Sequence, residues 1–376
     1  MNIKNIIVSL VFILFLSVVS IVNIITPQKS FSESENRYLA LFPKFNLENI
    51  YNGKFNSEFE KYASDQFLGR DYFIGVNVLS EILLGKKDSN GVYFGDDGYL
   101  LEKVDENSID KERLEKNINL LNEFFDSLRE NENIESMNAM IVPTAPYILS
   151  DKLPDYAQQY NQQYILKMLE ENLGENFINL YSSLDQHKDE YIYYKTDHHW
   201  TTYGAFLAYK EYCIKNGLEI PNINDYKIQE VSNEFLGTIY SKVQIPNIEK
   251  DIMYKFVEDN DFSITYNYDE ESNSLYKDDY LEKRDKYAYY LNGNNAITEI
   301  KTNVNNSKHI LVIKDSFAHC FTPFLTENFE KITMIDYRYF NASTKELIES
   351  EGITDVLVMY NTINFAGDRD FYNIVR

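Results

Sequence analysis

The pattern of hydrophobic and polar positions begins with an uncharged apolar run at residues 6–25. A run of about 20 such residues is long enough to cross the hydrocarbon core of a membrane as a helix. Lys4 precedes the run, as expected of a short cytoplasmic end. A cleaved signal peptide is the alternative, but its apolar core is usually about 7 to 15 residues long and ends at a small-residue cleavage site. We therefore predict a membrane anchor at 1–27, and in either case a chain that continues outside the cytoplasm.

Residues 28–130 are predicted to form a polar linker and then a lead-in segment that packs on the main domain. In GVYFGDDGYLLE (91–102), the pair Asp97-Gly98 lies between apolar runs. This predicts a hairpin, because the turn needs residues that tolerate positive φ. Over 114–128, apolar side chains recur at three- and four-residue steps, the stripe of an amphipathic helix.

From about residue 131 onward, short apolar runs alternate with stretches of helical spacing. We expect strands at 137–143, 177–181, 309–315, 331–337 and 355–361, and helices at 157–172, 203–216, 317–329 and 344–351. This alternation predicts an α/β domain over 131–376, with a mainly parallel sheet covered by helices on both faces. Residues 222–300, rich in Tyr, Asp, Asn and Ser, break the rhythm and are predicted to be an irregular or β insertion.

The charge and composition of the chain limit its partners. The formal net charge is -23, which repels phosphate backbones, so we expect no nucleic-acid partner. The 31 tyrosines offer flat apolar faces with a hydroxyl, which suit sugars, although the composition is equally typical of an AT-rich genome. Cys213 and Cys320 could form a disulfide outside the cytoplasm.

A candidate nucleophile follows the predicted strand in HILVIKDSFAHCFTPFL (309–325). The strand pattern stops at Lys314-Asp315-Ser316, where a helical pattern begins. A serine there lies at the carboxyl end of a strand, beside free backbone N–H groups that can stabilise an oxyanion. An isolated Asp-Ser pair could equally be a helix cap.

The stretch KTDHHWTTYGAF (195–206) contains groups that could activate this serine. Serine needs a base to take its proton, and the base needs a third group that fixes its tautomer. Asp197 and His199 are two residues apart, so in an extended segment they point to the same side. Asp197 can therefore hold the imidazole of His199 towards Ser316, and Trp200 is expected to pack against this loop.

Two other interpretations use nearby residues. Metal binding by Asp197, His198 and His199 is disfavoured, because adjacent histidines in extended chain point apart and no H-E-x-x-H or C-x-x-C pattern is present. We therefore expect no metal and no cofactor. His319 could replace His199 as the base, but Asp197 would then have no role. The sequence also contains no G-x-S-x-G, Walker A or dinucleotide fingerprint.

The two motifs together resemble a known family. T-D-H-H-W before a predicted helix, and a later strand that ends in D-S-F, are similar to the SGNH-hydrolase-like group that includes the DHHW proteins and the alginate acetylation proteins of the AlgX and AlgJ type. The resemblance covers most of residues 30–376, including an ENRYLALFP lead (35–43) and the hairpin at 91–102. It implies an SGNH-hydrolase-like fold in which Asp197 and His199 are the acid and base and Ser316 is the nucleophile.

The resemblance also suggests further site residues and shows one departure. SGNH-type oxyanion holes usually add a glycine amide and an asparagine side chain, for which Gly237 of NEFLGTIYSK and Asn361 after the last strand are the candidates beside the Ser316 amide. His198 is expected to contact substrate or the surrounding loop. Lys314 stands where the family usually has glycine.

The function implied by the resemblance is transfer of acetyl groups to an exopolysaccharide or cell-wall glycan. Relatives act beside a membrane-bound acyltransferase that exports the acetyl group, so such a supplier is an expected partner, together with the polysaccharide acceptor. A carbohydrate acetylesterase with the same triad, or an inactive polysaccharide-binding or assembly protein, are the alternatives. The chain would be secreted if its N-terminal segment were cleaved.

Overall fold

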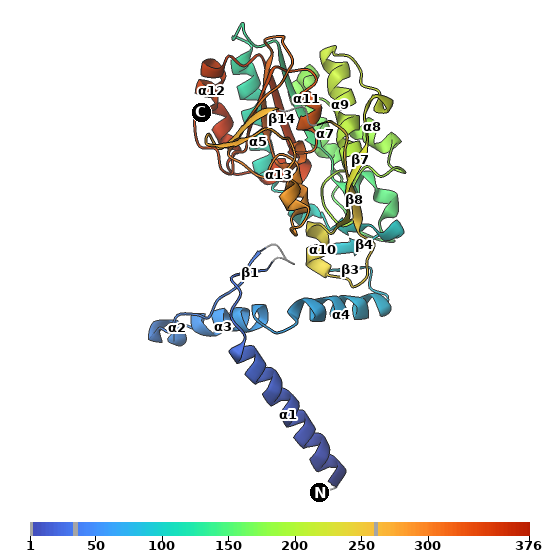
Figure 1. Cartoon of the computed structure of the whole chain (residues 1–376), viewed down its shortest axis with the longest axis vertical. Coiled ribbons are helices and arrows are strands. Elements are labelled where there is room, and N and C mark those ends of the chain that lie inside the picture. The colour runs from blue at the N-terminus through green and yellow to red at the C-terminus, as the bar shows by residue number, and fades with distance from the viewer. Residues whose placement is uncertain (1–2, 33–36, 259–261) are drawn as a thin grey trace. The chain divides into compact units, whose positions relative to one another are not determined.

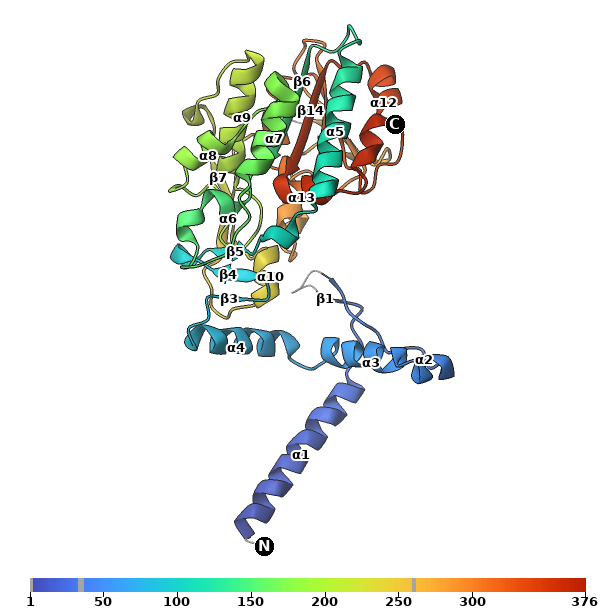
Figure 2. The same ribbon diagram turned by 180° about the vertical axis from the view of Figure 1, so that it is seen from behind.

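The fold is described from a computed structural model that covers residues 3–32, 37–258 and 262–376 (Figures 1 and 2). Residues 35–36 of the predicted lead and 259–261 of the predicted insertion lie outside the described residues. The α-helices are α1 (Ile3–Ile25), α2 (Leu47–Tyr51), α3 (Lys54–Asp65), α4 (Arg70–Leu83), α5 (Lys111–Leu128), α6 (Ala145–Ile148), α7 (Gln163–Leu173), α8 (Tyr181–Gln186), α9 (Thr202–Asn216), α10 (Thr238–Val243), α11 (Thr322–Leu325), α12 (Thr344–Glu351) and α13 (Thr362–Gly367). The strands are β1 (Phe31–Ser32), β2 (Arg37–Tyr38), β3 (Asp88–Ser89), β4 (Val92–Phe94), β5 (Leu100–Glu102), β6 (Ser136–Val142), β7 (Gln229–Phe235), β8 (Asp251–Lys255), β9 (Ser263–Tyr266), β10 (Glu270–Ser272), β11 (Ile297–Lys301), β12 (His309–Lys314), β13 (Lys331–Ile335) and β14 (Asp355–Asn361).

The chain divides into two compact units. The helical unit comprises residues 1–90 and 240–248, and the sheet unit comprises residues 91–239 and 249–376. Within the helical unit, α1 has a mean hydropathy of 2.8 over its best 18-residue window and no buried residue, so by length and composition it could cross a membrane.

The sheet unit is built around a mixed sheet of seven strands in the order β10-β9-β11-β13-β12-β14-β6. The half formed by β13, β12, β14 and β6 is parallel, as the alternating pattern predicted. The other half, β11, β9 and β10, is antiparallel and comes from the predicted insertion at 222–300. The expectation of a mainly parallel sheet was therefore correct for only one half of the sheet. The antiparallel strands carry polar residues and lack the continuous apolar runs that mark a central parallel strand.

Helices cover both faces of this sheet (Figures 1 and 2). On β12, Ile310 and Val312 join a hydrophobic cluster with α9 and α11, whereas Leu311 and Ile313 join a second cluster with α5 and α7. This alternation follows from the period of two in a strand, and it buries both faces of β12 completely.

Several predicted elements have different bounds in the structure. The segment 177–181 forms only an isolated bridge between Phe177 and Ala139 before α8 begins. The helix predicted at 317–329 is broken into the 3-10 helix η8 (Ser316–Ala318) and the one-turn α11, in which a proline without an N–H occupies the first turn. Cys213 and Cys320 are both buried free thiols, so the disulfide that they could have formed is absent.

The hairpin and the amphipathic helix were predicted correctly. β4 and β5 pair antiparallel, and Asp97 and Gly98 adopt positive φ angles of 55° and 80° between them. α5 begins at the side-chain cap of Asp110 and buries the predicted apolar stripe.

Candidate active site

The turn that carries Ser316, the candidate nucleophile, is formed where β12 ends. The Asp315 carboxylate accepts hydrogen bonds from the N–H of Phe317 at 2.9 Å, the N–H of Asn361 at 2.8 Å and Asn364 Nδ2 at 2.7 Å. These bonds tie the turn to the end of β14 and cap η8. Ser316 is thereby placed, half-buried, at the carboxyl end of the parallel half of the sheet.

The T-D-H-H-W loop is held by buried polar groups from the insertion. The Asp251 carboxylate, 2% exposed, accepts from the N–H groups of Lys195 at 2.7 Å and Thr196 at 2.8 Å. At the other end of the loop, the indole N–H of buried Trp200 donates to the carbonyl of Phe317 at 3.0 Å. Trp200 therefore joins this loop to the nucleophile turn, which agrees with its expected packing role.

Asp197, His199 and Ser316 lie in a hydrogen-bonded row. His199 Nδ1 is 2.5 Å from Asp197 Oδ1, and His199 Nε2 is 2.7 Å from Ser316 Oγ. Because a carboxylate only accepts, the hydrogen of the neutral imidazole lies on Nδ1, and Nε2 is left to accept the proton of the serine hydroxyl. This is the arrangement of a base, its orienting acid and a nucleophile.

Burial controls the protonation of this row. Burial lowers the pKa of His199 to about 4, and a positive charge on His198 acts in the same direction, against the raising effect of Asp197. Burial alone would raise the pKa of Asp197, but the neighbouring charges of His198 and His199 and the bonds that the carboxylate accepts hold it well below its usual range. At neutral pH, Asp197 is therefore ionised and His199 is a neutral base.

We expect the acid limb of the kcat/KM–pH profile to lie near pH 4, well below the pH 6.5 of an unperturbed histidine. The base works only when it is neutral, so activity falls as pH drops through the pKa of His199. The measurement is kcat/KM for an acetyl ester between pH 3 and pH 8, as far down as circular dichroism shows a folded protein. His198→Asn should move the limb to higher pH, and a wild-type limb centred between pH 6 and pH 7 would contradict the expectation.

Thr238 and Gly237 support Asp197 from the opposite side. The N–H and hydroxyl of Thr238 donate to Asp197 Oδ2 at 2.7 Å and 3.0 Å. The N–H of Gly237 donates to Thr196 Oγ1 at 3.0 Å, so it holds the loop and is not directed at Ser316. The expectation that Gly237 contributes its amide to an oxyanion hole is therefore corrected: the structure places it behind the acid.

We expect Gly237→Ala to lower kcat/KM by about 100-fold or more, because a misplacement of about 1 Å can have that effect. An added Cβ would lie 2.1 Å from Asp197 Cβ and 2.3 Å from Oδ2, so the carboxylate must move. Gly367→Ala is the matched control, since no atom lies within 4 Å of the position of its Cβ. Equal kinetics for the two variants would show that the close approach of Gly237 has no functional role.

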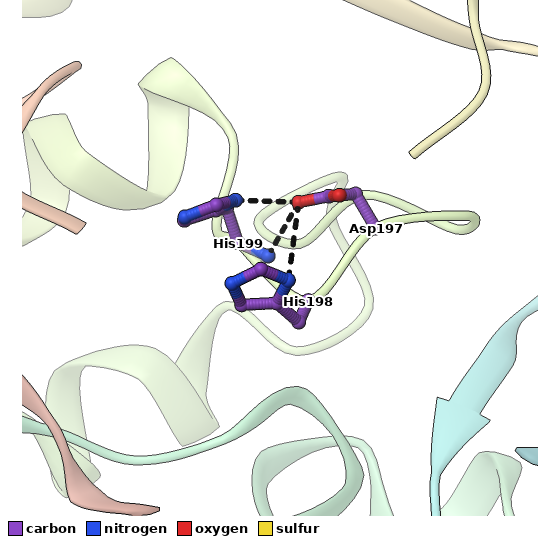
Figure 3. Close-up of side chains that lie close together, drawn as sticks. All are labelled: Asp197, His198 and His199. Atoms are coloured by element: carbon purple, nitrogen blue, oxygen red, sulfur yellow. Dashed lines mark hydrogen bonds and ion pairs between the residues drawn. The ribbon is translucent and has the colours of Figure 1, made fainter. Parts of the chain in front are cut away.

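His198 lies beside the row, as Figure 3 shows for its ring and the Asp197 carboxylate. Its Nδ1 is 2.7 Å from Thr238 Oγ1, and its ring centroid is 3.9 Å from that of His199. The two histidines therefore do not point apart as expected, because residues 195–199 form bends and are not extended.

The close approach of Asp197, His198 and His199 raises the question of whether they could bind a metal ion. One ligand atom from each of Asp197, His198 and His199 lies within 4.8 Å of the others, a spacing that could suit an ion. In this arrangement, however, both nitrogens of His199 and both oxygens of Asp197 have hydrogen-bond partners. A metal would have to displace them, so the donor set fits a proton-transfer row better than a metal site.

Tyr287, which no sequence motif singled out, stacks on His199. Its ring stacks on His199 with centroids 3.8 Å apart and an angle of 10° between planes. Its hydroxyl donates to the carbonyl of Ser316 at 3.3 Å. Tyr287 lies in the 3-10 helix η7 (Lys286–Tyr289) of the insertion and belongs to no recognisable motif. Its contact with His199 forms only when the insertion folds onto the sheet, so the sequence alone does not show it.

The other candidates for an oxyanion hole are less direct. Asn361 uses its side-chain oxygen to cap α13 and its N–H to bind Asp315, so it supports the turn. The N–H groups of Phe317 and Ala318 both donate to Asp315. Within the described part of the chain, the N–H of Ser316 has no hydrogen-bond acceptor. It is therefore the donor best placed to bind an oxyanion formed at Ser316.

Lys314 stands in a buried polar cluster beneath the turn. Its ammonium is 3.2 Å from Asp336 Oδ2 and 2.9 Å from His319 Nε2, and all three residues are no more than 2% exposed. Neither Lys314 nor Asp315 has a positive φ, so the turn does not require the glycine that the family usually has there. His319 is bonded to Lys314 and not to the Ser316 hydroxyl, so it does not act as the alternative base.

We expect Asp336→Asn to reduce the free energy of unfolding by about 3–5 kcal/mol, because it leaves the buried charge of Lys314 without its counter-ion. Asp336 also accepts two bonds from the guanidinium of Arg338 and one from its main-chain N–H, and the guanidinium bonds would weaken as well. Chemical denaturation measures the change. Glu135→Gln, which breaks an exposed pair with Lys308, is the control and should cost less than about 1 kcal/mol. A loss no larger than that of the control would contradict the expectation.

Comparison with known proteins shows the same fold. The fold is similar to that of a DHHW family protein from Eubacterium siraeum, with 24% identity, a TM-score of 0.65 and coverage of 76% of this chain and 95% of that one. It is also similar to Bacillus cereus PatB1, with 24% identity, a TM-score of 0.64 and coverage of 73% and 97%. PatB1 with a sulfonyl adduct gives 23% identity and a TM-score of 0.61, with coverage of 75% and 99%. No curated protein sequence matches significantly. The DHHW protein family matches residues 90–335, more than half of the chain and a region that contains both motifs, and the chain therefore belongs to the DHHW protein family.

Proposed function

We propose that this DHHW protein is a membrane-anchored, extracytoplasmic O-acetyltransferase that transfers acetyl groups to a polysaccharide. In this proposal α1 holds the chain in the membrane, and Ser316, His199 and Asp197 form the catalytic triad. Family membership supports the class of protein. The resemblance of the two motifs to those of the alginate acetylation proteins supports a polysaccharide acceptor.

One observation carries the chemistry. His199 Nε2 lies 2.7 Å from Ser316 Oγ, while His199 Nδ1 lies 2.5 Å from Asp197. A general base must be within hydrogen-bond reach of the proton that it removes, and this one is.

The reaction would run through an acetyl-serine. His199 Nε2 takes the proton of Ser316 as Oγ attacks the carbonyl carbon of an acetyl donor. The tetrahedral intermediate collapses, the donor oxygen leaves with the proton from His199, and the acetyl group stays on Ser316. A sugar hydroxyl then gives its proton to His199 and attacks the acetyl carbon. Ser316 leaves with that proton, and the acetylated sugar is released.

The acetyl donor requires a partner. Acetyl-CoA is a cytoplasmic compound, so an enzyme outside the membrane needs acetyl groups delivered across it. A membrane-bound acyltransferase is the supplier that the proposal implies.

An acetylesterase is the second candidate. Ser316 is half-buried and in contact with solvent, so water could resolve the same acyl-enzyme in place of a sugar. The two activities differ in how well the site excludes water and binds an acceptor, not in the triad.

The test uses the purified full chain in detergent, with p-nitrophenyl acetate as donor and defined oligosaccharides as acceptors. Transfer predicts acetylated oligosaccharide by mass spectrometry, whereas an esterase releases only acetate. Since PatB1 has been seen with a sulfonyl adduct, a sulfonyl fluoride is a suitable label for the serine. A protein that neither turns over the ester faster than His199→Ala nor forms an adduct on Ser316 would be a binding protein, and the proposal would fail.

A further inference from the structure

The helical unit has an apolar surface that its own fold does not cover. One side of α4 is packed: Gly75 and Val78 are buried, and a Cβ at Gly75 would lie 2.4 Å from the carbonyl oxygen of Gln244 in the same unit. Another stripe of α4 and its C-cap is exposed, and its apolar residues lie three, four or seven residues apart, which places them on one side of the helix. This exposed stripe consists of Tyr72, Phe73, Val76, Leu83 and Leu84. Leu83 and Leu84 are 86% and 84% exposed, so α4 is apolar on two sides.

The start of α4 is bonded to the end of α1. The N–H of Leu68 donates to Asn23 Oδ1 at 2.8 Å, and Asn23 lies in the last turn of α1. Two residues before Leu68, the side-chain amide of Gln66 accepts from the N–H of Lys29 at 3.0 Å and donates to the carbonyl of Lys29 at 2.9 Å. These hydrogen bonds therefore hold the loop between α3 and α4 beside the C-terminal end of α1.

The length of α1 sets the depth of this loop. Its 23 residues, at about 1.5 Å each, span about 35 Å, against about 30 Å for the hydrocarbon core of a bilayer. If α1 crosses the bilayer, Asn23 lies where the hydrocarbon ends, and Leu68 and the first turn of α4 lie at the same level. Phe67, Tyr72 and Phe73, which contact one another as aromatic pairs, are then at the depth where aromatic side chains gather in membrane proteins.

Charge separates this region from the rest of the chain. Residues 1–90 contain nine Lys or Arg and nine Asp or Glu, so the net charge of -23 lies entirely in residues 91–376. An anionic lipid surface repels the acidic residues 91–376 but not residues 1–90, whose charges balance. Lys87, three residues after the exposed stripe ends at Leu84, suits lipid phosphates, whereas Lys86 is paired with Glu81 at 2.7 Å.

We propose that α4, with Phe67 and Leu68 before it, lies in the membrane interface, with its exposed stripe among the lipid headgroups and upper acyl chains. The partner of this surface is the lipid of the bilayer that α1 crosses. This inference rests on the membrane location proposed for α1, and it adds a second attachment that holds the start of the chain flat on the outer surface.

The experiment places nitroxide labels on the full chain in lipid nanodiscs that contain phosphatidylcholine and phosphatidylglycerol but no other protein. Single cysteines are introduced as Phe73→Cys and Leu84→Cys in the exposed stripe, Val11→Cys in α1 and Lys167→Cys on exposed α7. Cys213 and Cys320 are no more than 1% exposed, and unlabelled wild type checks that they do not react. Collision with oxygen reports lipid, and collision with a water-soluble nickel chelate reports water. Thermal melting confirms that each variant is folded.

The expected result is that labels at 73 and 84 collide more with oxygen than with nickel, as the label at 11 does, whereas the label at 167 shows the reverse. If labels at 73 and 84 match the label at 167 while the label at 11 reports lipid, α4 is in water and the inference is wrong although the anchor stands. Protection from both reagents would show protein contact, such as a second copy, and would also overturn it. A label at 11 in water would remove the anchor itself.

Discussion

Ser316→Ala is expected to lower the turnover number for acetyl transfer by about 10⁶-fold, as expected when the nucleophile of a serine triad is removed. Without Oγ, no acetyl-serine can form, and the proton acceptor His199 Nε2 loses its partner at 2.7 Å. The measurements are the rate of p-nitrophenol release and the intact mass of the protein after brief exposure to the donor. The acetyl adduct should be present in wild type and absent in the variant.

Two further variants make this result specific. Ser182→Ala removes an exposed serine of α8 and should leave the rate unchanged. The double variant of Ser316→Ala with His199→Ala should be no slower than either single variant, because the two residues act as one unit. A Ser316→Ala protein that keeps a few per cent of wild-type turnover, or still becomes acetylated at this site, would exclude Ser316 as the nucleophile.

Asp197→Asn is expected to lower kcat by about 10⁴-fold while the fold survives. The amide keeps the volume of the carboxylate but can present a donor to His199 Nδ1, which favours the wrong tautomer and leaves Nε2 unable to accept from Ser316. It also removes the negative charge that stabilises the imidazolium of the intermediate. The measurement is kcat for the acetyl ester, together with the thermal transition.

Asp189→Asn on the exposed surface is the matched control for this change. If Asp197→Asn lost activity only in proportion to a loss of folded protein, the role of Asp197 would be structural. Asp197→Glu restores a carboxylate, but we do not expect it to restore the wild-type pH profile. Its longer side chain would disturb the bonds that Thr238 donates to Asp197.

The parallel half of the fold could be predicted from sequence because its strands are short, continuous apolar runs. β6, β12 and β14 lie within one residue of their expected bounds at each end. The antiparallel half could not, because β9, β10 and β11 carry exposed polar residues, and β9 and β11 join the sheet by pairing with strands that lie far along the chain. Tertiary pairing there overrides any local signal.

The same division applies to the candidate site. Residue type and the two motifs were enough to select Asp197, His199 and Ser316, which the structure brings together although residues 195–199 are bent and not extended as expected. They were not enough for Thr238, Asp251 and Tyr287, which contact the motif from the insertion. These three residues belong to no sequence motif, and only their positions in the fold identify them. Those positions depend on how a polar segment without a local pattern packs on the sheet. Asn361 and Gly237 were selected by analogy. The structure gives Gly237 a supporting contact in place of the oxyanion role, and the contacts of Asn361 support the turn, so its oxyanion role stays a prediction.

The single tryptophan of the chain gives the protein an internal optical probe. Trp200 is the only indole, it is fully buried, and its N–H is bonded to the residue that follows the nucleophile. Its emission on selective excitation therefore reports on one place, the contact between the histidine loop and the serine turn. A shift in that emission would follow acylation, ligand entry or local opening of the site in the unmodified protein, with no dye attached.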